Sequence, residues 1–154
     1  NPTSHTMVSS RIASLHVNGA LWGEFEVGVH AAALRGVPVW FLSGDAATCA
    51  CAQALVPGVS TVATKEGVGY SVLSRTPEAV LAEIEARTLE ALTRPEKPTA
   101  LVLPDHFSVE VAYLHHYDAK NAAHYPGARL HTPCVVRFES DDYAEVLRFF
   151  HFVI

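Results

Sequence analysis

Apolar and polar residues alternate from Ile12 to Val17, and the next two residues are Asn18-Gly19. Because successive side chains of a strand point to opposite faces, this alternation predicts a strand. Asn-Gly readily adopts the positive φ angles of a tight turn, so the chain is expected to return through Leu21-Trp22 as a hairpin. From Glu24 to Leu34 apolar residues occur all round the helical wheel, which predicts a largely buried helix closed by Gly36.

The middle of the chain alternates between strand and helix signals. Residues 38–42 form a short apolar run typical of a strand inside a sheet. Asp45 is suited to cap a helix over residues 45–55, and a β-rich segment follows at 60–64. Thr76-Pro77 marks the start of another helix, which is expected to end near Leu92. This order predicts an α/β fold with a mixed sheet and flanking helices.

The last third of the chain follows a stiff, proline-containing connector at residues 94–98. Its pattern predicts a strand at 99–103, a helix or helical pair at 108–123, a strand at 131–138 and a closing helix at 141–150. A turn is expected at Tyr125-Pro126-Gly127. With no repeat and no low-complexity tract in 154 residues, we expect one α/β domain spanning residues 1–154.

Composition narrows the classes of function. The chain is 49% hydrophobic and 18% charged, against about 25% charged in an average soluble protein, and this surplus predicts a buried interface. A net charge of −5 without a basic cluster disfavours a nucleic-acid partner. No apolar stretch is long enough for a membrane span. Cys49, Cys51 and Cys134 match no zinc or redox spacing, which favours a reducing, cytoplasmic location.

Four residues are candidates for chemistry. His5 lies in a polar stretch suited to a loop, and imidazole exchanges protons near neutral pH, although an isolated histidine is most often a surface residue. Glu24 follows Gly23 at a helix start, where any carboxylate is favoured. Arg11 could clamp an anion or form an ordinary salt bridge, and Lys65 could point into a cleft or be solvated.

A group of histidines and one aspartate in the last third lacks the spacing of a zinc site, so surface or interface roles are favoured for them. They are His106, His115, His116, Asp118, His124 and His131.

Several short motifs occur in a particular order: Ser4-His5-Thr6-Met7, Gly23-Glu24, Ser43-Gly44-Asp45, and Val62 to Gly67. This ordered set, which continues to the Pro126-Gly127 turn, resembles the C-terminal half of the zinc D-aminopeptidases of the bacterial dipeptide-transport operon type. The resemblance implies the C-terminal portion of a two-part metallopeptidase fold, with His5 as the catalytic residue and Glu24 as a zinc ligand. Gly28 stands where an asparagine is common in that family.

The family's remaining zinc ligands, an Asp-x-Glu and two histidines, have no counterpart here and would precede Asn1. A catalytic zinc needs about three protein ligands, and two ions need more. We therefore expect the isolated chain to bind zinc poorly and to have little peptidase activity. The resemblance implies that the N-terminal half of the same protein, or a complementary subunit, completes a two-zinc site.

The resemblance further implies release of N-terminal residues from short peptides containing D-amino acids, and assembly into a ring-like homo-oligomer. The alternative is a non-catalytic fragment that kept the scaffold as a binding or assembly module. A separate hydrolase built on the cysteines or histidines of the last third is disfavoured, because no nucleophile there has a base at a recognisable spacing.

Overall fold

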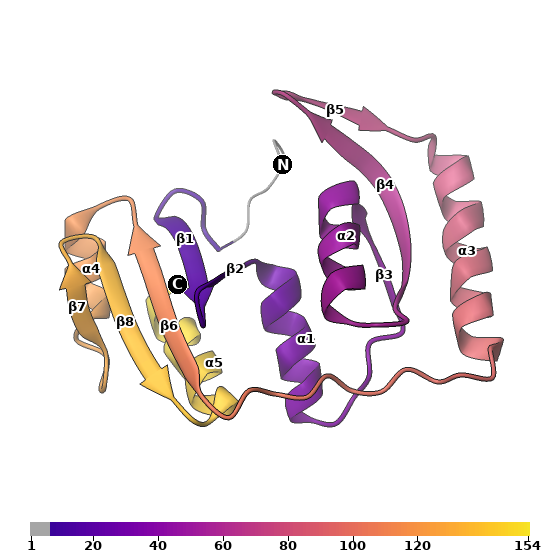
Figure 1. The fold of residues 1–154 in the computed structure, drawn as a ribbon. Coiled ribbons are helices and arrows are strands. Elements are labelled where there is room, and N and C mark those ends of the chain that lie inside the picture. The colour runs from indigo at the N-terminus through magenta and orange to yellow at the C-terminus, as the bar shows by residue number, and fades with distance from the viewer. Residues whose placement is uncertain (1–6) are drawn as a thin grey trace. The chain divides into compact units, whose positions relative to one another are not determined.

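The protein is represented by a computed structural model that describes residues 7–154. The described chain forms two compact units (Figure 1). Of the described residues, 36–101 belong to unit 1, and 7–35 together with 102–154 belong to unit 2. The order of strand and helix signals did not predict this division, and the single domain over residues 1–154 stays a prediction.

Unit 2 is built on a five-stranded antiparallel sheet with the order β2-β1-β6-β8-β7. The strands are β1 Ile12–Val17, β2 Ala20–Trp22, β6 Phe107–Tyr113, β7 Arg129–Thr132 and β8 Val135–Ser140. The predicted β1–β2 hairpin is confirmed, with φ of 50° at Asn18 and 80° at Gly19. The Asn18 side chain also fixes the start of β6: its Nδ2 donates to the carbonyl oxygen of His106 at 2.9 Å, and its Oδ1 accepts from the Ser108 amide at 2.7 Å.

Three helices belong to unit 2: α1 Glu24–Leu34, α4 His116–Ala122 and α5 Tyr143–Val153. Helix α5 packs on β6 and β8 and against α1, while α4 packs on the same two strands. The core between them consists of large side chains that are at most 1% exposed, each of which stabilises the fold by about 1.5–3 kcal/mol through burial. They include Leu15, Val17, Phe107, Val109, Val111, Val136, Tyr143, Val146 and Phe149.

Unit 1 contains β3 Phe41–Asp45, α2 Ala46–Leu55, β4 Ser60–Val68, β5 Ser71–Ser74 and α3 Pro77–Thr93. Its sheet has the order β3-β4-β5, with β3 parallel and β5 antiparallel to β4. Helices α2 and α3 both pack on β3 and β4 (Figure 1). Asp45 caps α2 as predicted, because its Oδ1 accepts from the amides of Ala47 and Thr48, both at 3.0 Å.

The α/β class is confirmed, with the mixed pairing confined to the sheet of unit 1. The helices predicted at 24–34, 45–55 and from Thr76 to about Leu92 are confirmed, and 141–150 corresponds to α5. Helix α1 is less buried than predicted, since only Val29 and His30 are buried. The strand predicted at 38–42 begins at Phe41, and the segment 131–138 spans parts of two strands, β7 and β8.

Two predictions for the last third were wrong. Residues 99–103 form no strand, because Pro98 and Pro104 bracket the apolar run and no neighbouring strand pairs with it in the described structure. The segment 108–123 is largely not helical: β6 runs to Tyr113 in the centre of the sheet, and the helix starts only at His116. Alternate residues of β6 are buried, so period-two packing against the sheet determined the structure of this segment.

Candidate functional site

Glu24 is the first residue of α1, directly after the N-cap Gly23. Two residues later, Glu26 accepts a hydrogen bond from the Gly23 amide at its Oε2, at 2.7 Å, and so satisfies a donor at the helix start. Glu24 is exposed, and within residues 7–154 its carboxylate has no hydrogen bond or ion pair. The two glutamates therefore differ: Glu26 caps the helix, whereas the Glu24 carboxylate has no partner among the described residues.

A cluster of aromatic side chains holds α1, and hence Glu24, against the rest of unit 2. The rings of Trp22 and His30 lie 4.2 Å apart between centroids, and His30 lies 5.7 Å from Tyr143. The Tyr143 hydroxyl donates to the carbonyl of Val27 at 2.9 Å. Sequence reasoning missed this cluster, because its members come from β2, α1 and α5 and share no local motif.

His30 is neutral in this setting. It is 4% exposed, and its Nδ1 donates to the backbone carbonyl of Glu26 at 2.7 Å. Burial lowers its pKa, and this effect outweighs the opposing influence of Glu26. Burial likewise raises the pKa of the Tyr143 phenol. The support beneath Glu24 is therefore uncharged at neutral pH.

Arg11 lies just before β1. Of the two roles that its sequence context allowed, an anion clamp and an ordinary salt bridge, the structure shows a salt bridge. Its Nε donates to Oδ1 of Asp118 at 3.3 Å, and Asp118 is only 8% exposed. Arg11 also borders a cavity of about 260 Å³. The other lining residues are Asn121, Ala122, Tyr125, Phe152 and Val153. Asp118 engages one of the five N–H donors of the guanidinium, and a substrate-binding role for Arg11 stays a prediction.

The structure does not bring the other candidates together. Lys65 is a half-buried residue of β4 in unit 1, opposite Ser74 of β5, and no ion pair joins it to another described side chain. His5, the candidate catalytic residue, lies outside the described residues. His106 pairs with Asp141 at 2.6 Å between Nδ1 and Oδ1, and the ring of His115 stacks on Tyr117.

The described residues contain no group of side chains that could form a metal centre by itself. From Met7 to Ile154, no three side chains among His, Cys, Asp and Glu lie close enough to hold an ion. Glu24 fits the chemistry of zinc, which accepts carboxylate oxygens. One such donor is fewer than the roughly three protein ligands of a catalytic zinc, so Glu24 fits as one member of a larger ligand set.

The comparisons with known proteins agree with the resemblance of the motifs. Residues 1–152 match the peptidase family M55, described as D-aminopeptidase. The chain belongs to this D-aminopeptidase family.

Two matches to known proteins extend the comparison of this family member. The D-aminopeptidase of Bacillus subtilis (strain 168) is 26% identical over 144 residues, which is 92% of this chain and 52% of the relative. A solved structure, the Zn-dependent D-aminopeptidase DppA from Bacillus subtilis, a self-compartmentalizing protease, superposes with a TM-score of 0.79 at 23% identity. That match covers 93% of this chain and 54% of DppA. The family member described here thus shares the fold of DppA and spans about half the length of these relatives.

Proposed function

We propose that this chain supplies part of the active site of a zinc-dependent D-aminopeptidase. In this proposal Glu24 is a zinc ligand and His5 is the catalytic residue, and the substrates are short peptides with D-residues. The family match over residues 1–152 supports the activity. The observation that carries the site is the exposed carboxylate of Glu24, which pairs with no other side chain among residues 7–154, on a helix anchored by buried aromatic rings.

Each group has a distinct task in the proposed reaction. Bound zinc, two ions in the complete site, supplies Lewis-acid activation of the peptide carbonyl and of water. Glu24 holds zinc through its carboxylate, with the α1 N-terminus stabilising its negative charge. His5 exchanges a proton with the scissile group, as imidazole does near neutral pH.

The remaining ligands come, in this proposal, from the N-terminal half of the same protein or from a complementary subunit. A ring-like homo-oligomer is the assembly we infer, since DppA is a self-compartmentalizing protease. The three cysteines form no disulfide, consistent with the reducing, cytoplasmic location that we propose. None of the helices that the structure describes combines the length and apolar character needed to cross a membrane.

Zinc titration of the isolated chain tests the shortage of ligands. Calorimetry should show weak binding, because Glu24 alone cannot replace three ligands. Tight, stoichiometric binding that Glu24→Ala abolishes would contradict this expectation, because the chain would then contain a complete site.

A chimera tests the role of Glu24 directly. This chain would be fused to the part of the Bacillus subtilis D-aminopeptidase that lies outside the match, and release of an N-terminal D-residue from a short peptide would be measured. Loss of an outer-shell partner already lowers metal affinity or activity about 10–100-fold, so Glu24→Gln should cost at least about 100-fold.

Glu26→Gln is the matched control in that chimera. Glu26 caps α1, so this change should lower stability by up to about 1 kcal/mol and leave most of the activity. A chimera whose zinc content and activity survive both Glu24→Gln and His5→Ala would instead favour the non-catalytic binding or assembly module.

A further inference from the structure

Strand β3 has an open edge. Within residues 7–154 its only strand neighbour is β4. The carbonyl oxygen of Trp40 accepts from the Ser60 amide at 3.0 Å, so Trp40 directs its backbone groups toward β4. Backbone polar groups of a strand alternate between its two edges, so Leu42 also faces β4 while Phe41 and Ser43 face away. The N–H and C=O groups of Phe41 and Ser43 therefore point to the open edge.

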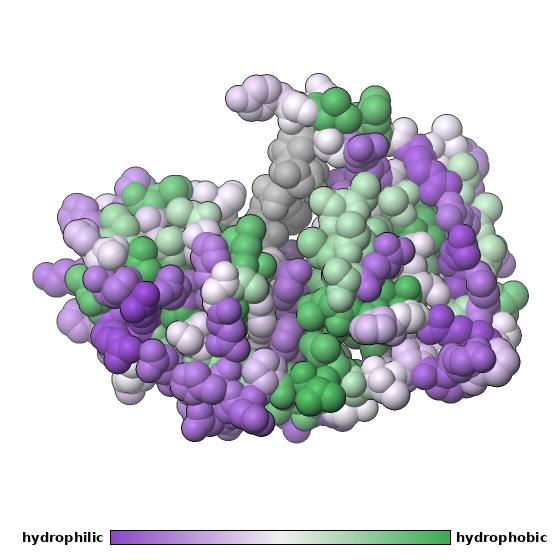
Figure 2. Space-filling view, in the orientation of Figure 1, coloured by the Kyte–Doolittle hydropathy of each residue, from purple (hydrophilic) through white to green (hydrophobic). Residues whose placement is uncertain are grey.

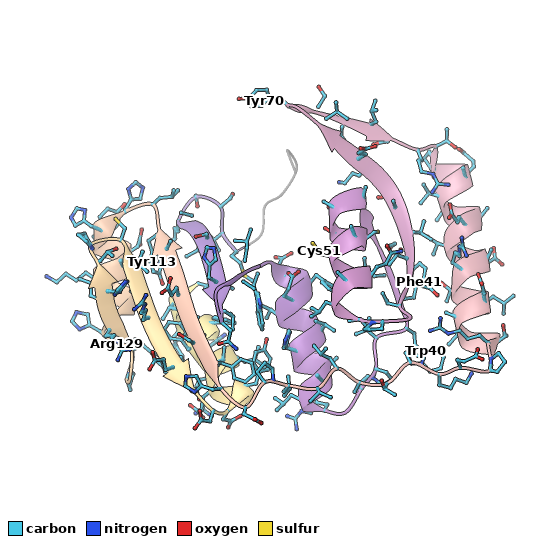
Figure 3. The ribbon with its side chains drawn as sticks, in the orientation of Figure 1. Trp40, Phe41, Cys51, Tyr70, Tyr113 and Arg129 are labelled. Carbon is cyan, nitrogen blue, oxygen red and sulfur yellow. The ribbon has the colours of Figure 1, made fainter. Side chains whose placement is uncertain are left out.

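The start of this strand and the residues that lead into it are apolar. Phe41 and Leu42 of β3 follow an apolar run at residues 37–40, and such runs are typical of parallel strands that are covered on both faces. Phe41, which is labelled in Figure 3, and Leu42 are only half-buried, and Ser43 is exposed. From Phe41 to Ser43 the edge carries no charge, proline or bulge, the features that protect natural edge strands. The pairing of β3 with β4 shifts register only at Gly44/Asp45, after this part of the strand.

The helix that follows β3 is also incompletely covered. Helix α2 is formed mainly by small apolar residues, and Ala50, Cys51 and Ala54 are exposed. Figure 2 shows apolar residues at the surface over this helix. An open edge next to an apolar helix surface is suited to receive another strand together with the structure attached to it.

We propose that the open edge of β3 pairs with a β-strand from the part of a complete D-aminopeptidase that this chain does not cover. The inference rests on the proposed function and names where the completing polypeptide docks. It is supported by length, since the chain covers 52% and 54% of the two relatives. Roughly half of each relative is thus available to supply the strand.

A second copy of this chain fits the edge less well. Two β3 strands related by a two-fold axis would pair antiparallel, and only Phe41 and Ser43 of each would direct backbone groups across the junction. So few hydrogen bonds do not offset the translational and rotational freedom lost on association. A polypeptide with its own core adds side-chain burial on both faces of β3.

Amide hydrogen exchange, followed by NMR without zinc or substrate, tests the proposal. In the isolated chain the amides of Phe41 and Ser43 should exchange fast at every protein concentration. In the chimera with the uncovered part of the Bacillus subtilis D-aminopeptidase they should exchange at least about 10-fold more slowly, as paired amides do. The amide of Val62, the buried residue of β4, should be protected in both and serves as the control.

Three results would overturn the proposal: fast exchange at Phe41 and Ser43 in a folded chimera, protection of both amides in the dilute isolated chain, or protection that rises with concentration. The last would assign the edge to a second copy. Since the readout needs no zinc, a chimera with a protected edge but no peptidase activity would refute the proposed function and leave the docking edge standing.

A proline substitution provides a second test. Ser43→Pro deletes an outward N–H, which an edge strand tolerates when that N–H faces solvent. In the isolated chain Ser43→Pro and the control Ser43→Ala should unfold at the same urea concentration as the wild type. In the chimera Ser43→Pro alone should abolish the protection of the Phe41 amide, and equal protection in both variants would count against strand pairing.

Discussion

The buried His30 should make the stability of unit 2 depend on pH in a way that one substitution removes. His30 is held neutral between Trp22 and Tyr143, and burial lowers its pKa from the ordinary value of 6.5. The unfolded chain binds a proton at this side chain near pH 6.5, whereas the folded chain binds it only at lower pH. His30 therefore contributes its full stability above pH 6.5, and this contribution decreases as pH falls through the folded pKa.

The size of the effect follows from one proton. Between the two pKa values of His30, the free energy of unfolding should fall by up to about 1.4 kcal/mol per pH unit. His30→Phe keeps an aromatic ring beside Trp22 and removes the titration. At pH 7.5 this change should cost about 0.5–1.5 kcal/mol for the lost hydrogen bond to the Glu26 carbonyl, offset in part by apolar burial. The cost should shrink on acidification, because only the wild type loses the His30 contribution.

Urea unfolding between pH 8 and pH 5 measures this difference. Fluorescence of Trp22 in a Trp40→Phe background reports on unit 2, and an NMR titration gives the pKa of His30 directly. The control is His131→Phe, which makes the same exchange of side chains at an exposed position of β7. Parallel pH profiles for wild type and His30→Phe, or a measured His30 pKa of 6.5 or higher, would refute the reasoning.

Two further predictions concern local structure. Asp45→Ala should lower the stability of unit 1 by about 1 kcal/mol and Asp45→Asn by much less, as judged by urea unfolding at pH 7, because asparagine also caps helices. Burial raises the pKa of Asp45, but hydrogen bonds from Thr48 and Ala47 outweigh this effect and lower the pKa below 3.8. The greater stability of the protein with Asp45 than with asparagine should therefore fade as pH falls below 3.8 and through the folded pKa. A difference in stability that persists at lower pH would contradict this assignment. Gly28→Ala, in exposed helix with open space around the new methyl group, should raise the melting temperature by stabilising α1 by about 0.5–1 kcal/mol, whereas Gly127→Ala should lower it, since φ is +85° and the added Cβ would lie 3.3 Å from Phe138 Cε2. Equal shifts in the two glycine variants would show that backbone conformation does not decide the outcome.

Sequence patterns predicted the elements whose signals are local. The Asn18-Gly19 turn, the Asp45 cap and the Thr76-Pro77 helix start each depend on a few adjacent residues, and each was confirmed. Strand β6 was misread, although Phe107, Val109, Val111 and Tyr113 are buried in alternation. The apolar and small residues of that segment also suit a helix, and only pairing with distant β1 and β8 makes it a strand.

The sequence predicted the residue types of the candidate site but not the contacts that hold helix α1 in place. Glu24 was identified from the Gly-Glu pair at a helix start, and the structure adds that Glu26 is the glutamate used for capping. The ring contacts that anchor α1 join β2, α1 and α5, and no spacing in the sequence encodes them. The sequence allowed Arg11 to be an anion clamp or to form a salt bridge, and only the fold reveals Asp118 as its partner.

The bonds between Asn18 and the start of β6 join residues 88 and 90 positions apart, with all of unit 1 between them in the chain. During synthesis, the β1–β2 hairpin must therefore emerge and wait while the whole of unit 1 is translated. Strand β6 and helix α5, which share a buried core with Leu15 and Val17, are made only after this interval. The strands and helices of unit 1 contact one another within residues 41–93, so these contacts are closer in sequence than those between the hairpin and β6. The nascent chain therefore contains all of these partners before it contains the partner of the hairpin.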